Sequence, residues 1–165
     1  MFKNTRARFG TKRDGFTLVE ILIVVGVIGL ILTGLVLSLN SKQKQLRDAK
    51  RLTDVNTIKD ALQVVKNETG SYERAYCDLT FVSLCSKNEN SELLKILPEL
   101  AQVNDPDVMN VACTSAKACY DSGCNYTFTK LDENDFEVYF HLEKGIDEFK
   151  SKGCYKVTPL GITKL

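Results

Sequence analysis

A run of 24 residues, Phe16 to Leu39, contains only one charged side chain, Glu20. As a helix rising 1.5 Å per residue, this run extends about 36 Å, enough to cross a bilayer whose hydrocarbon core is about 30 Å thick. A carboxylate in hydrocarbon is costly and therefore rare, and such a residue usually has a partner and a function. The run thus predicts a membrane-compatible helix with one acid whose role needs an explanation.

Other interpretations of the apolar run explain less. A core helix of a soluble domain is disfavoured, because the run is too long and lacks a polar stripe. A cleaved secretory signal fits the basic start, but no small-x-small cleavage site follows the run, and no cysteine follows it as in a lipoprotein signal. A plain signal anchor is possible: the basic leader would stay cytoplasmic and the bulk of the chain would face outward. It leaves Glu20 unexplained, unless the acid reaches toward headgroups as an interfacial residue.

The stretch GFTLVE, Gly15 to Glu20, stands between a basic leader and the apolar run. This arrangement resembles the cleavage signal of type IV prepilins and their pseudopilin relatives. The resemblance implies that a prepilin peptidase and methylase cuts between Gly15 and Phe16 on the cytoplasmic side and methylates the new amino group of Phe16. The expected organisation is then a cleaved leader at 1–15, a transmembrane and filament-core helix at 16–40, and the rest of the helix with a globular head at 41–165.

The resemblance also gives Glu20 a role, as the fifth residue of the mature chain and the position of the family's single buried acid. In a filament without lipid, the nearest free cation is the terminal ammonium of Phe16 in a neighbouring subunit. A buried charge without a partner is heavily penalised, whereas a paired one roughly breaks even. We therefore expect Glu20 and Phe16 to set the register of assembly.

The helix is expected to continue beyond the apolar run to about Glu68, because neither proline nor glycine occurs between Asn40 and Gly70. Apolar residues recur there at helical spacing and indicate an amphipathic helix rather than a coiled coil. Gly70 is a plausible end of the helix. The stripe comprises Leu52, Val55, Ile58, Ala61, Leu62 and Val65.

The remaining residues predict a small antiparallel sheet preceded by loops and a short helix that begins at Ser91. Strands are expected at 125–131, 136–143 and 154–158, and the loop DEND joins the first two as a hairpin. Alternation in the middle strand predicts an apolar face of Phe136, Val138, Phe140 and Leu142. His141 is expected on the opposite face, as a surface residue. A three-stranded meander on the helix stripe gives an α+β fold that matches the layout of pilin heads.

All six cysteines lie in the predicted exterior part, an even number that favours disulfides formed in an oxidising compartment. We expect Cys77 to pair with Cys85, because they bracket one loop, and Cys154 to pair with Cys113, Cys119 or Cys124. Zinc is the competing interpretation, but the spacing lacks a Cys-x-x-Cys motif and the chain has one histidine. We therefore predict neither a metal nor another cofactor.

The charge distribution and motifs exclude several classes of function. The first fifteen residues carry a net charge of +4, and the remainder holds 17 basic and 20 acidic residues, or −3. A mildly acidic remainder gives no reason to expect specific nucleic-acid binding. With no catalytic constellation in the sequence, we expect no enzyme.

The resemblance predicts a structural subunit of a type IV pilus that serves adhesion, twitching motility or DNA uptake. The chain would be a single-pass protein of the cytoplasmic membrane before the pilus assembly machinery adds it, with other pilins, to a surface filament. Two alternatives remain. One is a pseudopilin of a type II secretion-like system, and the other is a membrane-anchored exterior binding module whose leader is never cut.

Overall fold

The computed structural model describes residues 15–108 and 110–165, and of these the side chains of all but 35–38, 121 and 122. The expected leader, apart from Gly15, lies outside the described residues. The chain divides into two compact units, Met1–Asn40 and Ser41–Leu165. Both include part of one long helix.

That helix, α1, spans Leu18–Thr69, within two residues of the expected bounds at each end. It ends where Gly70 adopts a φ of 82°, a conformation that glycine enters without steric cost, and the Gly70 amide donates to the Lys66 carbonyl at 2.8 Å. In α1, the three glycines at 26, 29 and 34 are helical.

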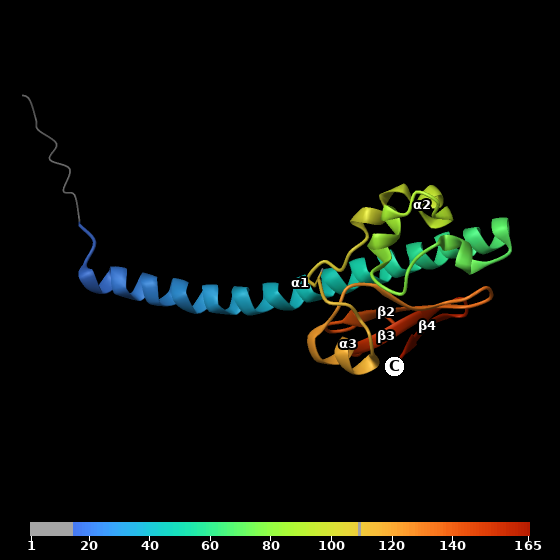
Figure 1. The fold of residues 1–165 in the computed structure, drawn as a ribbon. Helices are drawn as coiled ribbons and strands as arrows, with labels where there is room; N and C mark the ends of the chain where they lie inside the picture. Colours follow the sequence, from blue (N-terminus) through green and yellow to red (C-terminus); the bar gives the residue numbers. More distant parts are fainter. Residues whose placement is uncertain (1–14, 109) are drawn as a thin grey trace, which may run out of the picture. The chain divides into compact units, whose positions relative to one another are not determined.

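Four antiparallel strands form one sheet in the second unit, in the order β1-β2-β3-β4. The sheet lies along the second half of α1 (Figure 1). The apolar stripe of the helix and the apolar face of β2 share one buried cluster, as the spacing and alternation predict. The strands are β1 at Thr127–Leu131, β2 at Phe136–Leu142, β3 at Gly153–Thr158 and β4 at Gly161–Lys164.

The fold is α+β and pilin-like, but strand β4 was not among the predicted strands. Its four residues are too few to show a period, and Pro159 and Gly161 nearby are typical of a turn rather than a strand. In the structure these residues form the hairpin between β3 and β4, in which Thr158 pairs with Gly161. The sheet therefore gains a fourth strand.

Short helical segments alternate with loops between α1 and the sheet. Helix α2, Glu92–Ile96, begins as expected at Ser91, whose hydroxyl accepts from the Leu94 amide. The other helical segments were not predicted: α3 at Ala116–Ser122 and the 3-10 turns η1 at Tyr72–Ala75, η2 at Val82–Lys87 and η3 at Pro98–Gln102. Each is shorter than two α-helical turns, so none shows a helical period in the sequence.

The expectation that His141 lies on the surface is wrong. The residue is only 5 % exposed, although the strand alternation places it on the face of β2 opposite to Phe140 and Leu142. Next to this face, four buried cysteines form a second cluster with Tyr139 packed against it. Helix α3 also contacts both β2 and β3. A short helix and cysteines thus cover a sheet face that we expected to be open to solvent.

Candidate processing and assembly site

Gly15, Phe16 and Thr17 precede the first turn of α1 and are not helical. All three are exposed, and a Cβ atom placed on Gly15 would have no neighbour within 4 Å. The bond between Gly15 and Phe16 therefore lies in non-helical backbone directly before a rigid helix. Such a peptide bond is accessible to a protease that needs an extended substrate.

Thr17 and Glu20 cap the beginning of α1 reciprocally. The Thr17 Oγ1 accepts from the Glu20 amide at 3.2 Å, and the Glu20 Oε2 accepts from the Thr17 amide at 3.4 Å. This is the Thr-x-x-Glu pattern of a capping box, which satisfies amides that the first helical turn leaves free. The sequence analysis did not identify this second role of Glu20, although the spacing of Thr17 and Glu20 was sufficient to predict it. Within one chain, Glu20 is thus held by a backbone amide.

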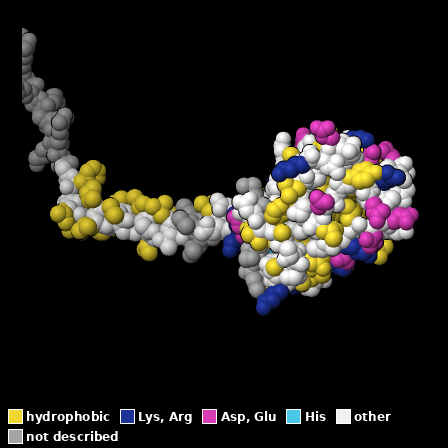
Figure 2. Space-filling model, in the orientation of Figure 1, with side chains coloured by type: hydrophobic (Ala, Val, Ile, Leu, Met, Phe, Trp, Pro, Cys, Tyr) yellow, Lys and Arg dark blue, Asp and Glu magenta, His cyan; other side chains and the backbone are white. Residues whose placement is uncertain are grey.

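The helix surface after this cap is almost entirely apolar. From Phe16 to Leu32 the large apolar side chains are between 49 % and 80 % exposed in the structure. Figure 2 shows hydrophobic side chains over this part of the helix. By length and composition, α1 is the one helix in the described part of the chain that can cross a membrane. A surface of this kind requires lipid or other apolar helices around it.

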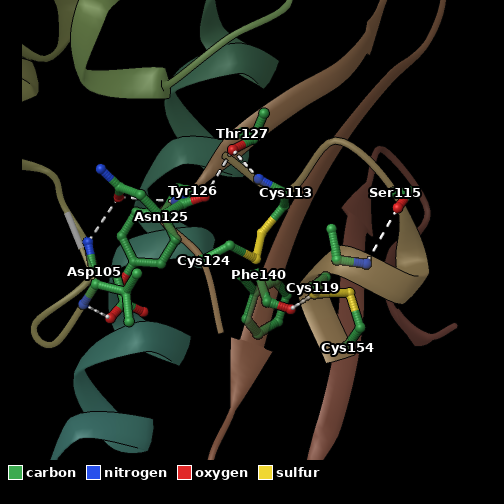
Figure 3. Close-up of a disulfide and its surroundings, with 12 residues drawn as sticks. Asp105, Cys113, Ser115, Cys119, Cys124, Asn125, Tyr126, Thr127, Phe140 and Cys154 are labelled. Atoms are coloured by element: carbon green, nitrogen blue, oxygen red, sulfur yellow. Dashed lines mark hydrogen bonds between the residues drawn. A yellow bond between two sulfur atoms is a disulfide. The ribbon is translucent and has the colours of Figure 1, made fainter. Parts of the chain in front are cut away.

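The structure pairs all six cysteines. Cys77 lies with Cys85, Cys113 with Cys124 and Cys119 with Cys154, at Cα–Cα distances of 4.8, 5.2 and 5.5 Å, within the range that disulfides require. Figure 3 shows that the second and third bridges lie close together beside the sheet. The Sγ atoms of Cys113, Cys119 and Cys124 all lie within 4.8 Å of one another. With sulfurs paired in this way, no thiolate is left to ligate zinc.

A buried ion network links the second half of α1 to the rest of its unit. The Arg51 side chain is 1 % exposed and binds Asp105 through two hydrogen bonds, of 2.6 and 2.9 Å. It also binds Asp48 at 2.8 Å and Glu143 at 2.7 Å. Glu143 in turn receives two hydrogen bonds of 2.6 Å from Arg47. Two arginines therefore neutralise most of the charge of three acids.

Asp48 also fixes the turn that follows β2. Its carboxylate accepts from the backbone amides of Glu143, Lys144 and Gly145 at 2.8–2.9 Å. Gly145 has a φ of 88°, and a Cβ atom there would lie 2.3 Å from the Phe149 carbonyl oxygen, so the turn requires glycine at this position. The turn is thereby attached to the helix.

The electrostatics of the network favour the ionised forms. Hydrogen bonds from Arg47 and then Arg51 lower the pKa of Glu143 from 4.5 to about 2, against the effect of burial. Burial alone lowers the pKa of Arg51, but its hydrogen bonds and the nearby acids raise it well above the ordinary value. The sequence analysis assigned no role to Arg47 or Arg51. The signal that identifies Asp48 and Arg51 is their position seven and four residues before Val55, on the buried stripe.

Comparison with known families gives a match at the N-terminus. Residues 10–36 match the prokaryotic N-terminal methylation motif. The chain carries a prepilin signal of the type IV pilin and pseudopilin kind. No curated protein and no solved structure matches it significantly.

This prepilin signal includes the three residues on which the resemblance depended, Gly15, Phe16 and Glu20. It indicates a precursor of a pilin-like or pseudopilin protein, a structural rather than an enzymatic class. An N-terminal apolar helix with this motif also fits anchoring in a membrane. The paired cysteines and the α+β head agree with the same class.

Proposed function

We propose that this protein is a structural subunit of a type IV pilus. The observation that carries the proposal is the prepilin signal at residues 10–36, placed directly before an exposed apolar helix that leads into a pilin-like α+β head. In this account a prepilin peptidase removes residues 1–15 and methylates the amino group of Phe16. Residues 16–40 anchor the precursor in the cytoplasmic membrane and later form the filament core. Residues 41–165 lie outside the membrane and form the filament surface.

Assembly then exchanges one partner of Glu20 for another. In the single chain the carboxylate is held by the Thr17 amide at the helix N-terminus, where the helix dipole also favours a negative charge. In the filament the terminal ammonium of Phe16 from a neighbouring subunit replaces or joins that amide. Because an unpaired ammonium in an apolar bundle is strongly unfavourable, only subunits that present Glu20 in the correct register are added.

We infer that the head acquires its three disulfides after it leaves the cytoplasm. Small exterior domains depend on disulfides, and the head pairs six cysteines in about 125 residues. Alkylation of protein isolated from cells, followed by mass spectrometry, tests this inference. We expect no alkylated cysteine before reduction and six after it, whereas six alkylated cysteines before reduction would contradict it.

Processing gives the most direct biochemical test. The mature chain is expected to begin at N-methylated Phe16, and Gly15→Leu is expected to leave the precursor at full length in the membrane, because a bulky side chain next to the bond blocks the peptidase. The matched control is Gly34→Leu, since Gly34 is also exposed and a Cβ there also has no neighbour within 4 Å. Intact-mass measurement should show full-length Gly15→Leu but a cleaved Gly34→Leu. A Gly15→Leu chain that still begins at Phe16 would refute the assignment of the cleavage site.

Shearing of cells distinguishes a pilus subunit from a pseudopilin of a secretion system. A pilus subunit is expected in the sheared fraction as long fibres, whereas a pseudopilin of a short filament stays with the cells. A chain that keeps residues 1–15 in every fraction would instead be a membrane-anchored exterior module.

A further inference from the structure

Two disulfides lie against each other in the second unit, where helix α3 packs against strand β3. Their four cysteines are each at most 2 % exposed and form a buried cluster separate from the main core. Figure 3 shows the two bridges side by side. Three of the sulfurs, taken from both bridges, lie within 4.8 Å of one another. We call this group the sulfur cluster, and it comprises Cys113, Cys119, Cys124 and Cys154.

A thiol that lies this close to a disulfide can exchange with it. The thiolate attacks one sulfur of the bridge, a new S–S bond forms, and the old bond breaks with its electron pair on the other sulfur. The leaving sulfur takes up the proton that the attacking thiol released, so nothing is oxidised or reduced overall. Among Cys113, Cys119 and Cys124 the sulfurs are at most 4.8 Å apart, a gap that a change of side-chain rotamer closes.

The spacing of these cysteines along the chain gives such exchange a use. Cys119 lies six residues after Cys113 and five before Cys124, whereas the bridges in the structure join residues 11 and 35 positions apart. Because a short loop costs less entropy to close, the first bridge in the unfolded segment is expected to join Cys119 to one of these two neighbours. Either bridge differs from the pairing of the folded head. The chain therefore needs a route from these early pairings to the final one.

We propose that the sulfur cluster is an internal disulfide-exchange site through which the head reaches its final pairing, an inference that rests on the disulfide-bonded exterior head proposed above. From an early Cys119–Cys124 bridge, the Cys113 thiolate attacks the Cys124 sulfur, and Cys119 leaves as a thiolate. A disulfide-bonded oxidant outside the cytoplasm then takes two electrons and two protons from the thiols of Cys119 and Cys154. These two residues form the last bridge, and the oxidant becomes a dithiol.

Burial confines the exchange to the sulfur cluster. Since its cysteines have almost no exposed area, a thiol from solution does not reach these sulfurs in the folded head, and a sulfur of the cluster itself is the attacking group. The remaining bridge, Cys77–Cys85, belongs to the main core and not to the sulfur cluster. A thiol at that bridge therefore has no second disulfide beside it and provides an internal control.

A free thiol beside an intact bridge tests exchange in the folded chain. Cys154→Ser leaves the Cys119 thiol next to the Cys113–Cys124 bridge. We would keep the purified full chain for hours, the timescale of uncatalysed disulfide rearrangement, at about pH 8.5, where a free thiol ionises. Acid then stops the exchange, because only the thiolate attacks, and alkylation in acidic denaturant with peptide mass spectrometry locates the thiol. We expect at least about a tenth of the label on Cys113 and Cys124 together, an exchange equilibrium within about tenfold of unity.

A second variant tests the other bridge and keeps the proposal testable if Cys154→Ser does not fold. Cys124→Ser leaves the Cys113 thiol next to the Cys119–Cys154 bridge, and attack on the Cys119 sulfur releases Cys154. The label is then expected on Cys154 as well as on Cys113. Cys77→Ser is the matched control, because it also leaves one thiol, at Cys85, but outside the sulfur cluster. Its label is expected to stay on Cys85.

Label that stays on Cys119 in Cys154→Ser and on Cys113 in Cys124→Ser overturns the proposal. An equal spread of label in Cys77→Ser also overturns it, as does a spread that changes with protein concentration, because either result shows exchange outside the sulfur cluster. The unchanged chain separates this failure from failure of the disulfides themselves. Six alkylated cysteines before reduction would overturn both inferences, whereas three intact bridges together with thiols that do not move would overturn the exchange site alone.

Discussion

At the scale of single residues, Arg51 determines whether charge can be buried between the helix and the sheet. Its guanidinium contacts three carboxylates, of which Asp48 and Asp105 are almost fully buried. A buried ion pair contributes little over a well-packed apolar pair, but removal of one partner leaves the other charges without compensation. Removal of Arg51 is therefore expected to lower the stability of the head by much more than the ion network adds over an apolar core of the same shape.

Arg51→Ala is accordingly expected to destabilise the head by about 3–5 kcal/mol, because two buried carboxylates lose their cation. Lys50→Ala is the matched control, since Lys50 is the preceding residue but its ion pair with Asp54 is exposed, and it is expected to change stability by at most about 1 kcal/mol. Chemical denaturation of the purified full chain gives both values. An Arg51→Ala head as stable as the Lys50→Ala head would mean that the network is not important for folding.

Glu143 makes part of this stability dependent on pH. Its pKa is lowered to about 2 in the folded chain from an ordinary 4.5. A lowered carboxyl pKa gives stability that is fully present above pH 4.5 and is lost as the pH falls toward 2. Glu143→Gln is therefore expected to melt at a lower temperature than the unchanged chain at pH 7, with a difference that narrows between pH 4.5 and 2. A difference that stays constant over that range would contradict the assigned charge state.

At the scale of elements, the disulfides attach segments that have little regular structure of their own. The three bridges close loops with sequence separations of 8, 11 and 35 residues. The longest, Cys119–Cys154, joins α3 to β3, whereas Cys77–Cys85 closes one local loop. In the chain-entropy account a longer closed loop stabilises more, because it restricts the unfolded chain more strongly.

We therefore expect the double variant Cys119→Ala/Cys154→Ala to lose about 1 kcal/mol more stability than Cys77→Ala/Cys85→Ala, from a total of about 2–5 kcal/mol for each bridge. Denaturant midpoints of the two variants and the unchanged chain provide the comparison. Equal losses, or a larger loss for the short loop, would show that local packing around the sulfurs outweighs loop entropy.

Elements in which a pattern of apolar residues repeats several times could be predicted from the sequence, and elements too short for such a repeat could not. The stripe of Val55, Ile58, Leu62 and Val65 and the alternation in β2 each repeat often enough to indicate a helix and a strand with one buried face. Strand β4 and helix α3 are too short to repeat. The burial of His141 depends on α3, because the segment that covers it is distant in sequence and has no signal of its own.

Part of the candidate site could be predicted in the same way. The motif from Gly15 to Glu20 gave the candidate processing and assembly residues. The capping box was missed because Glu20 was considered only as a charge in a membrane or filament and not as a residue that caps its own helix. The ion network was missed because Arg51 resembles an exposed basic residue when it is not placed on the buried stripe. Asp105, its main partner, lies in a loop 54 residues later, and no local pattern connects the two.

At the scale of the whole molecule, the two units of the chain are suited to different environments, one aqueous and one apolar. The second unit has its own core and a dense polar network, whereas the described apolar residues of the first unit lack buried contacts and need lipid or other subunits. Glu20 caps its own helix in the single chain, and we propose that its carboxylate also pairs with a neighbouring subunit in the filament. The central claim of the account is that assembly uses the charge of Glu20 and not only its capping.

Thr17→Val and Glu20→Gln separate these two roles. Thr17→Val removes the hydroxyl of the cap but keeps the charge, and we expect it to lower filament yield only in part, since losing a cap costs about 0.5–2 kcal/mol. Glu20→Gln keeps an oxygen that can accept from the Thr17 amide but removes the charge that would pair with the ammonium of a neighbouring Phe16.

The decisive measurement is the amount of each chain in the membrane and sheared-filament fractions of cells that express it as the sole copy. For Glu20→Gln we predict normal membrane insertion, normal cleavage before Phe16 and almost no protein in the sheared fraction, because each added subunit would bury an ammonium without its carboxylate. A sheared-fraction yield for Glu20→Gln equal to that of the unchanged chain would contradict the account and leave Glu20 with helix capping alone.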